Sequence, residues 1–240
     1  AGSSWDIVNN WWEYYDNESS MLHADIPEIR FFLDQEYNEV ALISTDGGLY
    51  FSDDNLETVQ NISMDGLGVG QYYSTYTKRT FPYNVYAGSQ DQGFQRSIIP
   101  GEGFFNFVQS ISGDYGHLSS SDDGETIWCN YPGFTLYYEN PVTGGGSQSL
   151  DFPGSGHLWL APLIEDPYNP NQAYLAGGGL SGGNHLFHLT AENGSITYDE
   201  EPFSFNGTVT AMGYSSIDPN NRYVLTYYGN FYHSSDDGNN

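Results

Sequence analysis

The sequence predicts an all-β fold, a β-propeller of four-stranded blades with Asp-box turns. Three observations lead to this prediction. The 240 residues include 29 Gly, 21 Tyr and 14 Phe, a composition typical of short strands and many turns. A turn motif of the form S-x-D-x-G-x-T recurs along the chain. Short predicted strands also recur in groups of four, and the groups repeat every 43 to 48 residues.

The turn motif is complete in residues 120–128, SSDDGETIW, which carry one extra residue before the Trp. Its Asp and Ser side chains are expected to bond nearby backbone amides, and its Gly to adopt a conformation that a side chain would penalise. The Trp is expected to pack between sheets. A degenerate copy occupies residues 52–59, with Leu in place of Gly, and residues 234–240 open another copy. The structural Asp-box residues are Ser52, Asp54, Ser120, Asp122, Gly124, Trp128, Ser234, Asp236 and Gly238.

The predicted strands follow in chain order. The aromatic residues 5–15 (WDIVNNWWEYY) read as a strand, so residues 1–20 are predicted to end a preceding blade. The first full repeat has predicted strands at residues 26–33, 39–45, 49–52 and 58–63. The second repeat has them at residues 71–77, 84–89, 94–97 and 104–110. Residues 90–93 form the turn that corresponds to residues 46–48 of the first repeat.

Three more repeats follow. The third opens at residues 113–117, the fourth has a strand at 172–176, and the fifth has one at 223–228. The glycine-rich residues 143–147 are predicted to form an exposed loop. Blades therefore start near residues 26, 70, 113, 160 and 208. Because each blade buries its faces only against its neighbours, we predict that residues 1–240 form about five blades of a six- to eight-bladed ring. Further domains are expected in a longer parent chain.

The formal net charge is −26, from 31 acidic and five basic residues. Nucleic acid and anionic membrane surfaces are not expected partners, because no cationic surface is available to bind them. No apolar run of about 18 residues occurs, so membrane insertion is not predicted. Such charge suits a screened external medium, and clustered carboxylates would suit Ca²⁺, the one cofactor this composition suggests. Cys129 is alone and is expected to be a small buried hydrophobe.

Five segments carry a resemblance to a known family: LHADIPEI (22–29), STDGGLYFS (44–52), QYYSTYT (71–77), AGSQDQGFQRS (87–97) and ISGDYGHL (111–118). The chain resembles the BNR/Asp-box, sortilin-like β-propellers of large secreted Bacteroidetes proteins, of the kind exported by the type IX secretion system. This resemblance implies an extracellular or cell-surface protein that meets the secretion machinery and carries more domains after the propeller. It implies no established activity.

Polar side chains at the starts of first strands and after second strands could converge near the propeller axis. The candidate ligand-binding residues are His23, Asp25, Gln90, Asp91, Asp114 and His117, and the candidate metal ligands are Asp46, Asp91 and Asp114. Carboxylates and carbonyls suit Ca²⁺, whereas His with Asp suits a transition metal. The alternative is that the Asp and Gln side chains cap turns by bonding backbone amides.

Catalytic residues are not identified by the sequence. A glycoside hydrolase needs two carboxyl groups across a cleft, and 31 acidic residues offer too many pairs for a choice. A sialidase is disfavoured, because only Arg30, Arg79, Arg96 and Arg222 are available and no F/Y-R-I-P motif occurs. No G-x-S-x-G motif supports a serine hydrolase, and Ser155 and His157, which are separated by one glycine, are interpreted as parts of a turn.

Several tyrosines are further candidates for ligand binding: Tyr72, Tyr73, Tyr76, Tyr137, Tyr138, Tyr227 and Tyr228. Exposed rings stack on sugar faces, and buried rings fill the space between blades. The leading hypothesis is an extracellular or cell-surface binding module for a glycan or a protein, within a larger secreted protein. The alternatives are a glycoside hydrolase on extracellular polysaccharide and a structural scaffold of a surface adhesin or filament. An enzyme is the less favoured interpretation.

Overall fold

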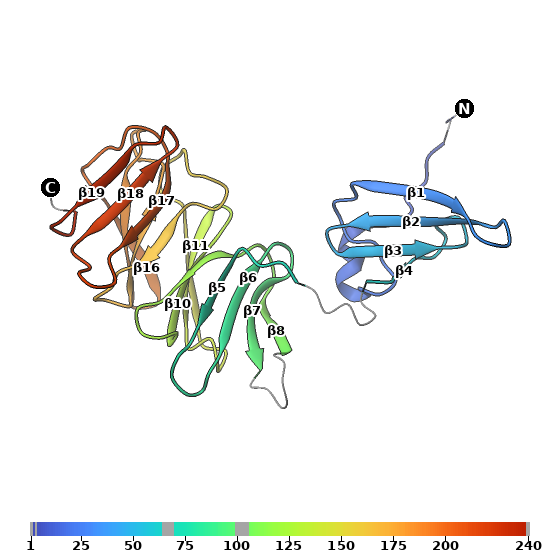
Figure 1. The fold of residues 1–240 in the computed structure, drawn as a ribbon, viewed down its shortest axis with the longest axis horizontal. Coiled ribbons are helices and arrows are strands. Elements are labelled where there is room, and N and C mark those ends of the chain that lie inside the picture. Colours follow the sequence, from blue (N-terminus) through green and yellow to red (C-terminus); the bar gives the residue numbers. More distant parts are fainter. Residues whose placement is uncertain (1, 3, 64–69, 99–105, 239–240) are drawn as a thin grey trace. The chain divides into compact units, whose positions relative to one another are not determined.

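The computed structural model describes residues 2, 4–63, 70–98 and 106–238. These residues contain 19 strands and one 3-10 helix, so the predicted all-β fold is confirmed. They form two compact units, residues 1–70 and residues 71–240, which are described separately (Figure 1). The predicted strand at 104–110 lies partly outside the described residues.

Unit 1 contains one four-stranded antiparallel sheet, which we call blade 1. Its strands are β1 (Glu28–Leu33), β2 (Glu39–Thr45), β3 (Gly48–Ser52) and the short β4 (Gln60–Asn61), paired in chain order. One face of the sheet is covered because Ala41, Ile43 and Tyr50 pack with Leu22 into a small buried core. The partly buried Leu56 and Val59 extend this core.

The strand expected at residues 5–15 is wrong. Trp11–Asp16 form a 3-10 helix, η1. The amide of Glu13 donates to the carbonyl of Asn10 at 3.0 Å, and the amide of Asn17 donates to the carbonyl of Tyr14 at 3.0 Å. The residues W-W-E-Y-Y do not alternate between apolar and polar, so they lack the period of two that a half-covered strand needs. Tyr14 instead packs edge-to-face on His23, with 4.7 Å between ring centroids.

Unit 2 contains four sheets, each paired antiparallel in chain order. The bounds of their strands follow. Blade 2 comprises β5 (Ser74–Thr77), β6 (Val85–Ser89), β7 (Gly93–Ile98) and β8 (Asn106–Ile111); blade 3 comprises β9 (Gly116–Ser119), β10 (Thr126–Tyr131), β11 (Phe134–Glu139) and β12 (Ser147–Asp151); blade 4 comprises β13 (Leu163–Glu165), β14 (Gln172–Ala176), β15 (Leu186–Glu192) and β16 (Ser195–Glu200); and blade 5 comprises β17 (Val209–Tyr214), β18 (Arg222–Thr226) and β19 (Phe231–Ser234).

Successive blades of unit 2 pack face to face. The first strand of each blade contacts the first strand of the next, from β5 to β9, β13 and β17. Buried apolar clusters fill the spaces between blades 2 and 3, blades 3 and 4, and blades 4 and 5. The second strands β6, β10 and β14 are therefore buried along most of their length, on both faces. Four-stranded antiparallel blades packed in this manner are the architecture of a β-propeller.

Three Ser-Asp turns, at residues 52–58, 120–126 and 234–238, share one hydrogen-bond pattern. In the second turn, Ser120 Oγ donates to Asp122 Oδ1 at 2.8 Å and accepts the amide of Gly124 at 2.8 Å. The same two bonds recur in the turns that begin at Ser52 and Ser234. Leu56 has a φ of 67° at the position that glycine fills elsewhere. The Leu56 side chain packs on the core of blade 1, and such packing can hold a residue in a strained backbone conformation.

The second Ser-Asp turn is placed differently in its blade from the first. It joins β9 to β10, the first and second strands, whereas residues 52–58 join β3 to β4, the third and fourth strands. Both connections lie at the same end of their sheets, because strands one and three run in the same direction. This placement explains why Ser120 follows Ser97 by fewer residues than one repeat.

The same turn connects three blades. The carboxylate of Asp123 accepts the backbone amides of Arg79 and Thr80, each at 2.8 Å, from the β5–β6 loop of blade 2. Glu125 pairs with Lys78, whose side chain is 2% exposed. On the other side, the fully buried Trp128 donates from Nε1 to the carbonyl of Pro170 in blade 4, at 3.0 Å. The turn thus bonds to the blade before it and the blade after it.

We expect Gly124→Ala to destabilise unit 2 more than Gly133→Ala. Both glycines have positive φ, 82° and 101°, so each substitution costs roughly 1–2 kcal/mol of backbone strain. A Cβ at Gly124 would also lie 2.9 Å from Cε2 of Tyr86, whereas a Cβ at Gly133 would have nothing within 4 Å. This overlap should add about 1–3 kcal/mol. Urea unfolding followed by Trp fluorescence measures the difference, and equal costs would contradict tight packing at the turn.

Candidate ligand-binding face

One end of the blades in unit 2 gathers most of the polar candidates. The loops before β5, β9 and β13 meet there with the β6–β7 turn. We call this surface the ligand face and define it by Tyr73, Gln90, Asp91, Asp114, His117 and Trp159.

Asp91 and Asp114 come together across blades 2 and 3. The backbone amide of Asp91 donates to Asp114 Oδ1 at 2.7 Å. Gln92 also forms a parallel bridge with Gly113, so the QDQG and GDYGH segments lie against each other. Asp91 has a φ of 59° and Gly93 a φ of 75°, which makes the β6–β7 turn tight. Asp114 therefore caps this turn, as the structural interpretation of the sequence expected, and the contact also fixes where the Asp91 side chain emerges.

Gln90 supports an exposed pair of rings. Tyr73 Oη donates to Gln90 Oε1, and the Tyr73 ring lies edge-to-face with Trp159 at 5.9 Å between centroids. Tyr73 is 44% exposed and Trp159 is 52% exposed. The two rings come from different blades, Tyr73 from the loop before β5 and Trp159 from the loop before β13. They form an aromatic corner with an amide group beside it.

His117 lies in β9 with a φ of 52°. Burial lowers the pKa of its imidazole, and a hydrogen bond with the backbone of Leu160 partly offsets that effect. Burial favours the neutral form of the ring, so the folded protein disfavours a charged imidazole at His117.

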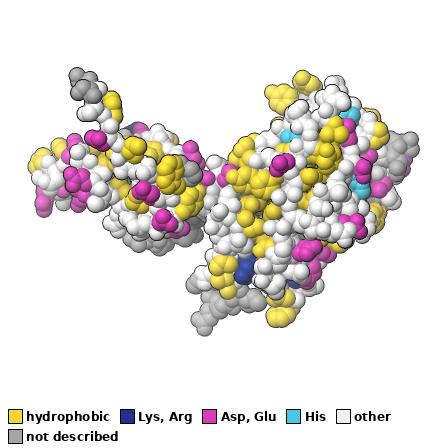
Figure 2. Space-filling model, turned by 180° about the vertical axis from the view of Figure 1, so that it is seen from behind, with side chains coloured by type: hydrophobic (Ala, Val, Ile, Leu, Met, Phe, Trp, Pro, Cys, Tyr) yellow, Lys and Arg dark blue, Asp and Glu magenta, His cyan; other side chains and the backbone are white. Residues whose placement is uncertain are grey.

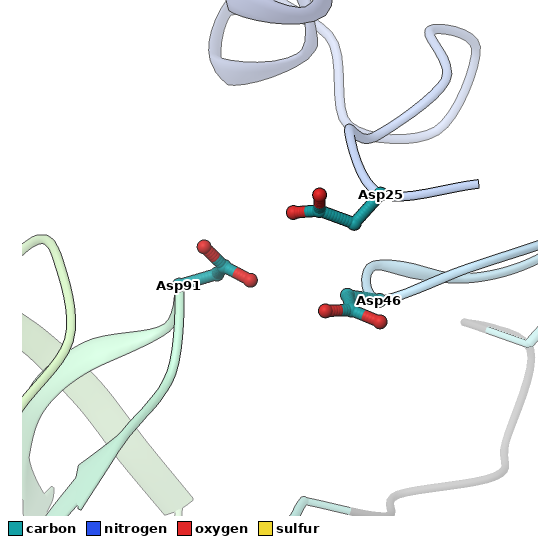
Figure 3. A group of neighbouring side chains, drawn as sticks. All are labelled: Asp25, Asp46 and Asp91. Carbon is teal, nitrogen blue, oxygen red and sulfur yellow. The ribbon is translucent and has the colours of Figure 1, made fainter. Parts of the chain in front are cut away.

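His23, Asp25 and Asp46 belong to unit 1. His23 is buried, its Nδ1 lies 3.0 Å from the carbonyl of Ala24, and a Cβ on Gly47 would lie 2.5 Å from it. This histidine is packed into the unit, with Tyr14 on its ring. Asp25 and Asp46 are exposed on adjacent loops, and carboxylate oxygens of the two lie within 4.8 Å of one another (Figure 3).

The candidate metal ligands are thus divided between the units, Asp46 in unit 1 and Asp91 and Asp114 in unit 2. Figure 3 also draws Asp91, which belongs to the β6–β7 turn of unit 2. Ca²⁺ binding stays a prediction. It is motivated in unit 1 by the Asp25 and Asp46 carboxylates and in unit 2 by the side chains around the Asp91 turn.

Trp159 was missed by the sequence reasoning. It stands in a loop, next to a glycine-rich stretch, without strand periodicity around it, and an isolated Trp in such a loop is the signal that could have identified it. Among the tyrosines considered, Tyr137 and Tyr138 are each 5% exposed and fill space between blades, whereas Tyr227 and Tyr228 are 77% and 70% exposed.

Two residues that could suggest nucleophilic chemistry are placed as expected. Cys129 is fully buried between blades 2 and 3, and burial raises the pKa of its thiol. His157 Nε2 lies 2.7 Å from the carbonyl of Pro153, within the turn that also contains Ser155. Neither side chain has the geometry of an activated nucleophile.

Acidic side chains are spread over the face shown in Figure 2, whereas Lys and Arg appear at few points. This distribution matches the formal charge of −26. In the part of the chain that the structure describes, no helix is long and apolar enough to cross a membrane.

Comparison with known proteins gives structural neighbours only. No family model and no curated protein matches the chain. The β-propeller domain of Cps50 (Swd1) from Myceliophteria thermophila is 14% identical, with a TM-score of 0.49 over 69% of this chain and 52% of that one. An auxiliary nutrient binding protein from Bacteroides ovatus is 12% identical, with a TM-score of 0.43 over 85% and 56%. The chain spans about half the length of these two solved chains.

We expect the stability of unit 2 to fall as the pH drops below about 6.5, the ordinary value for histidine, because of His117. Its pKa is lowered in the folded state, so the unfolded chain binds the proton more readily. The stability that depends on a neutral His117 is fully present above the pKa of the unfolded state. It is lost as the pH falls toward the lower pKa of the folded state. His117→Asn, because Asn tolerates positive φ, should flatten the stability profile below about pH 6.5. His233→Asn, at an exposed residue, is the control; identical profiles for both variants would exclude His117.

Added Ca²⁺ is expected to raise the melting temperature of unit 1, because it would neutralise the facing carboxylates of Asp25 and Asp46. Asp46→Asn should remove that rise, while Glu36→Gln, which lowers the charge of the same unit equally, should retain it. Asp91→Asn tests unit 2 in the same titration. Equal Ca²⁺ responses from all three variants and the wild type would place ion binding elsewhere. Calorimetric scans with Ca²⁺ and with a chelator provide the measurement.

Proposed function

We propose that this β-propeller chain is a glycan-binding module of an extracellular or cell-surface protein, and that it binds at the ligand face of unit 2. The exposed aromatic corner of Tyr73 and Trp159 beside Gln90 is the observation that carries the proposal. Sugar rings present C–H faces that pack on aromatic rings, and their hydroxyl groups require polar partners nearby.

Charge narrows the class of glycan. The formal net charge of the chain is −26. The residues that define the ligand face include the carboxyl groups of Asp91 and Asp114 but no Lys or Arg. An acidic polysaccharide would be repelled by such a face. Carboxylates, an amide and a neutral imidazole suit the hydroxyl groups of an uncharged sugar, so a neutral oligosaccharide is the expected ligand.

Binding is favoured over hydrolysis by the state of Asp114. A glycoside hydrolase needs two carboxyl groups free to act across a cleft. Asp114 Oδ1 already accepts a hydrogen bond from the amide of Asp91 at 2.7 Å. The Asp114 carboxylate therefore stabilises the β6–β7 turn. Hydrolysis of extracellular polysaccharide is the alternative function, and a scaffold role in an adhesin or filament is the second. The resemblance to secreted BNR, Asp-box propellers supports the extracellular assignment, together with the shared bonding of the three Ser-Asp turns.

Trp159→Ala should weaken binding of a neutral oligosaccharide at least tenfold, because central aromatic anchors often contribute 2 kcal/mol or more, about a thirtyfold change. A panel of neutral glucan, xylan and mannan oligosaccharides is screened first, and calorimetry then measures affinity for those that bind. Phe81→Ala is the matched control, since Phe81 is 77% exposed in the β5–β6 loop, at the opposite end of blade 2.

Three outcomes separate the functions. Loss of affinity in Trp159→Ala but not in Phe81→Ala supports the ligand face. Equal effects in both variants, or no binding by the wild type to any member of the panel, would overturn the glycan proposal. Shortened oligosaccharides after prolonged incubation would establish the hydrolase instead.

A further inference from the structure

Blade 1 contains an open cavity of about 250 Å³ that is separate from the ligand face. It lies at the end of the sheet where β2 begins and β3 ends, opposite the end that carries Asp46. Its lining residues are Phe31, Glu39, Val40, Ala41, Asp53, Asp54 and Asn55. All of them belong to unit 1.

The lining combines an aromatic ring with several carboxyl groups. The Phe31 side chain is 49% exposed, and Phe31 is paired with Ala41 of β2, so the two side chains share one face of the sheet. Glu39, Asp53 and Asp54 supply the carboxyl groups. Asp54 accepts bonds from Ser52 and from both the amide and the hydroxyl of Thr58, at 2.6 to 2.9 Å, and these lower its pKa. This carboxylate is held in place and stays ionised near neutral pH.

Unit 1 has no cation of its own for this cavity. Arg30 is the only Lys or Arg among residues 1–70, and its Nε pairs with Glu28 Oε1 at 2.6 Å. Arg30 and Phe31 are successive residues of β1, so their side chains point to opposite faces of the sheet. Among the residues of unit 1 that the structure describes, the three carboxyl groups around the cavity therefore have no Lys or Arg partner.

We propose that this cavity binds an arginine side chain presented by a partner polypeptide. The planar guanidinium would stack on Phe31 while its N–H groups bond to the carboxylates, and the aliphatic stem would lie along the start of β2 at residues 39–41. The volume is smaller than the roughly 300–1,000 Å³ of sites for whole small molecules, and it suits a single side chain. Within the described residues, the carboxylates of Glu39, Asp53 and Asp54 do not form a group tight enough for a metal ion, so an organic cation is the expected ligand.

Nuclear magnetic resonance titration of the whole chain with N-acetyl-arginine amide tests the proposal. Saturable shifts are expected at Phe31, Val40 and Ala41. N-acetyl-citrulline amide, the neutral counterpart of similar shape, should give none. Glu39→Gln and Phe31→Leu should each weaken binding about twofold to fivefold, as expected for one exposed charge contact or cation–π contact. Raising the salt concentration should weaken binding as well.

Glu36→Gln is the matched control, because it removes one negative charge from the same unit at a residue outside the cavity. Its affinity for the arginine probe should equal that of the wild type. No saturable shift in the wild type, an equal response to the citrulline probe, or equal losses in Glu39→Gln and Glu36→Gln would each overturn the proposal. The failure of this site would leave the ligand face of unit 2 unaffected, since the two lie in different units.

Discussion

The Ser-Asp turn at residues 120–126 is the constraint on which the packing of unit 2 most depends. Internal bonds from Ser120 and Asp122 fix the loop, and the fixed loop presents Asp123 to the backbone of blade 2. The strand that follows carries Trp128 into the space beside blade 4. A local hydrogen-bond pattern is thereby converted into contacts between sheets. In a propeller, where blades share no hydrogen-bonded strands, such contacts and the buried apolar clusters hold neighbours together.

The ligand face depends on the same packing at the opposite end of the blades. Tyr73, Asp114 and Trp159 precede the first strands of three successive blades, so the spacing of those strands determines whether their side chains meet. Asp114 bonds the turn of the preceding blade directly. A surface assembled across blades in this way gains rigidity from the sheets, while its loops can carry different side chains.

Much of the fold follows from the sequence because strand periodicity and turn residues are local signals. Residues 39–45 and 172–176 were predicted as strands with the bounds that β2 and β14 have. The strand predicted at residues 5–15 is wrong because aromatic content alone does not distinguish a strand from a 3-10 helix such as η1. For the site, the segments around Asp91 and Asp114 were identified, but their mutual hydrogen bond and the position of Trp159 were not. Those features depend on contacts between blades, which repeat spacing does not specify.

The burial of Cys129 allows the reactivity of its thiol to report on opening of the structure around it. Its thiol is the only one in the sequence and lies in the apolar cluster that joins blades 2 and 3. A thiol-modifying reagent can reach the sulfur only when those blades separate, so the labelling rate in the native protein measures how often that junction opens. The dynamics of one blade junction can therefore be followed in the unmodified chain, without introducing a probe.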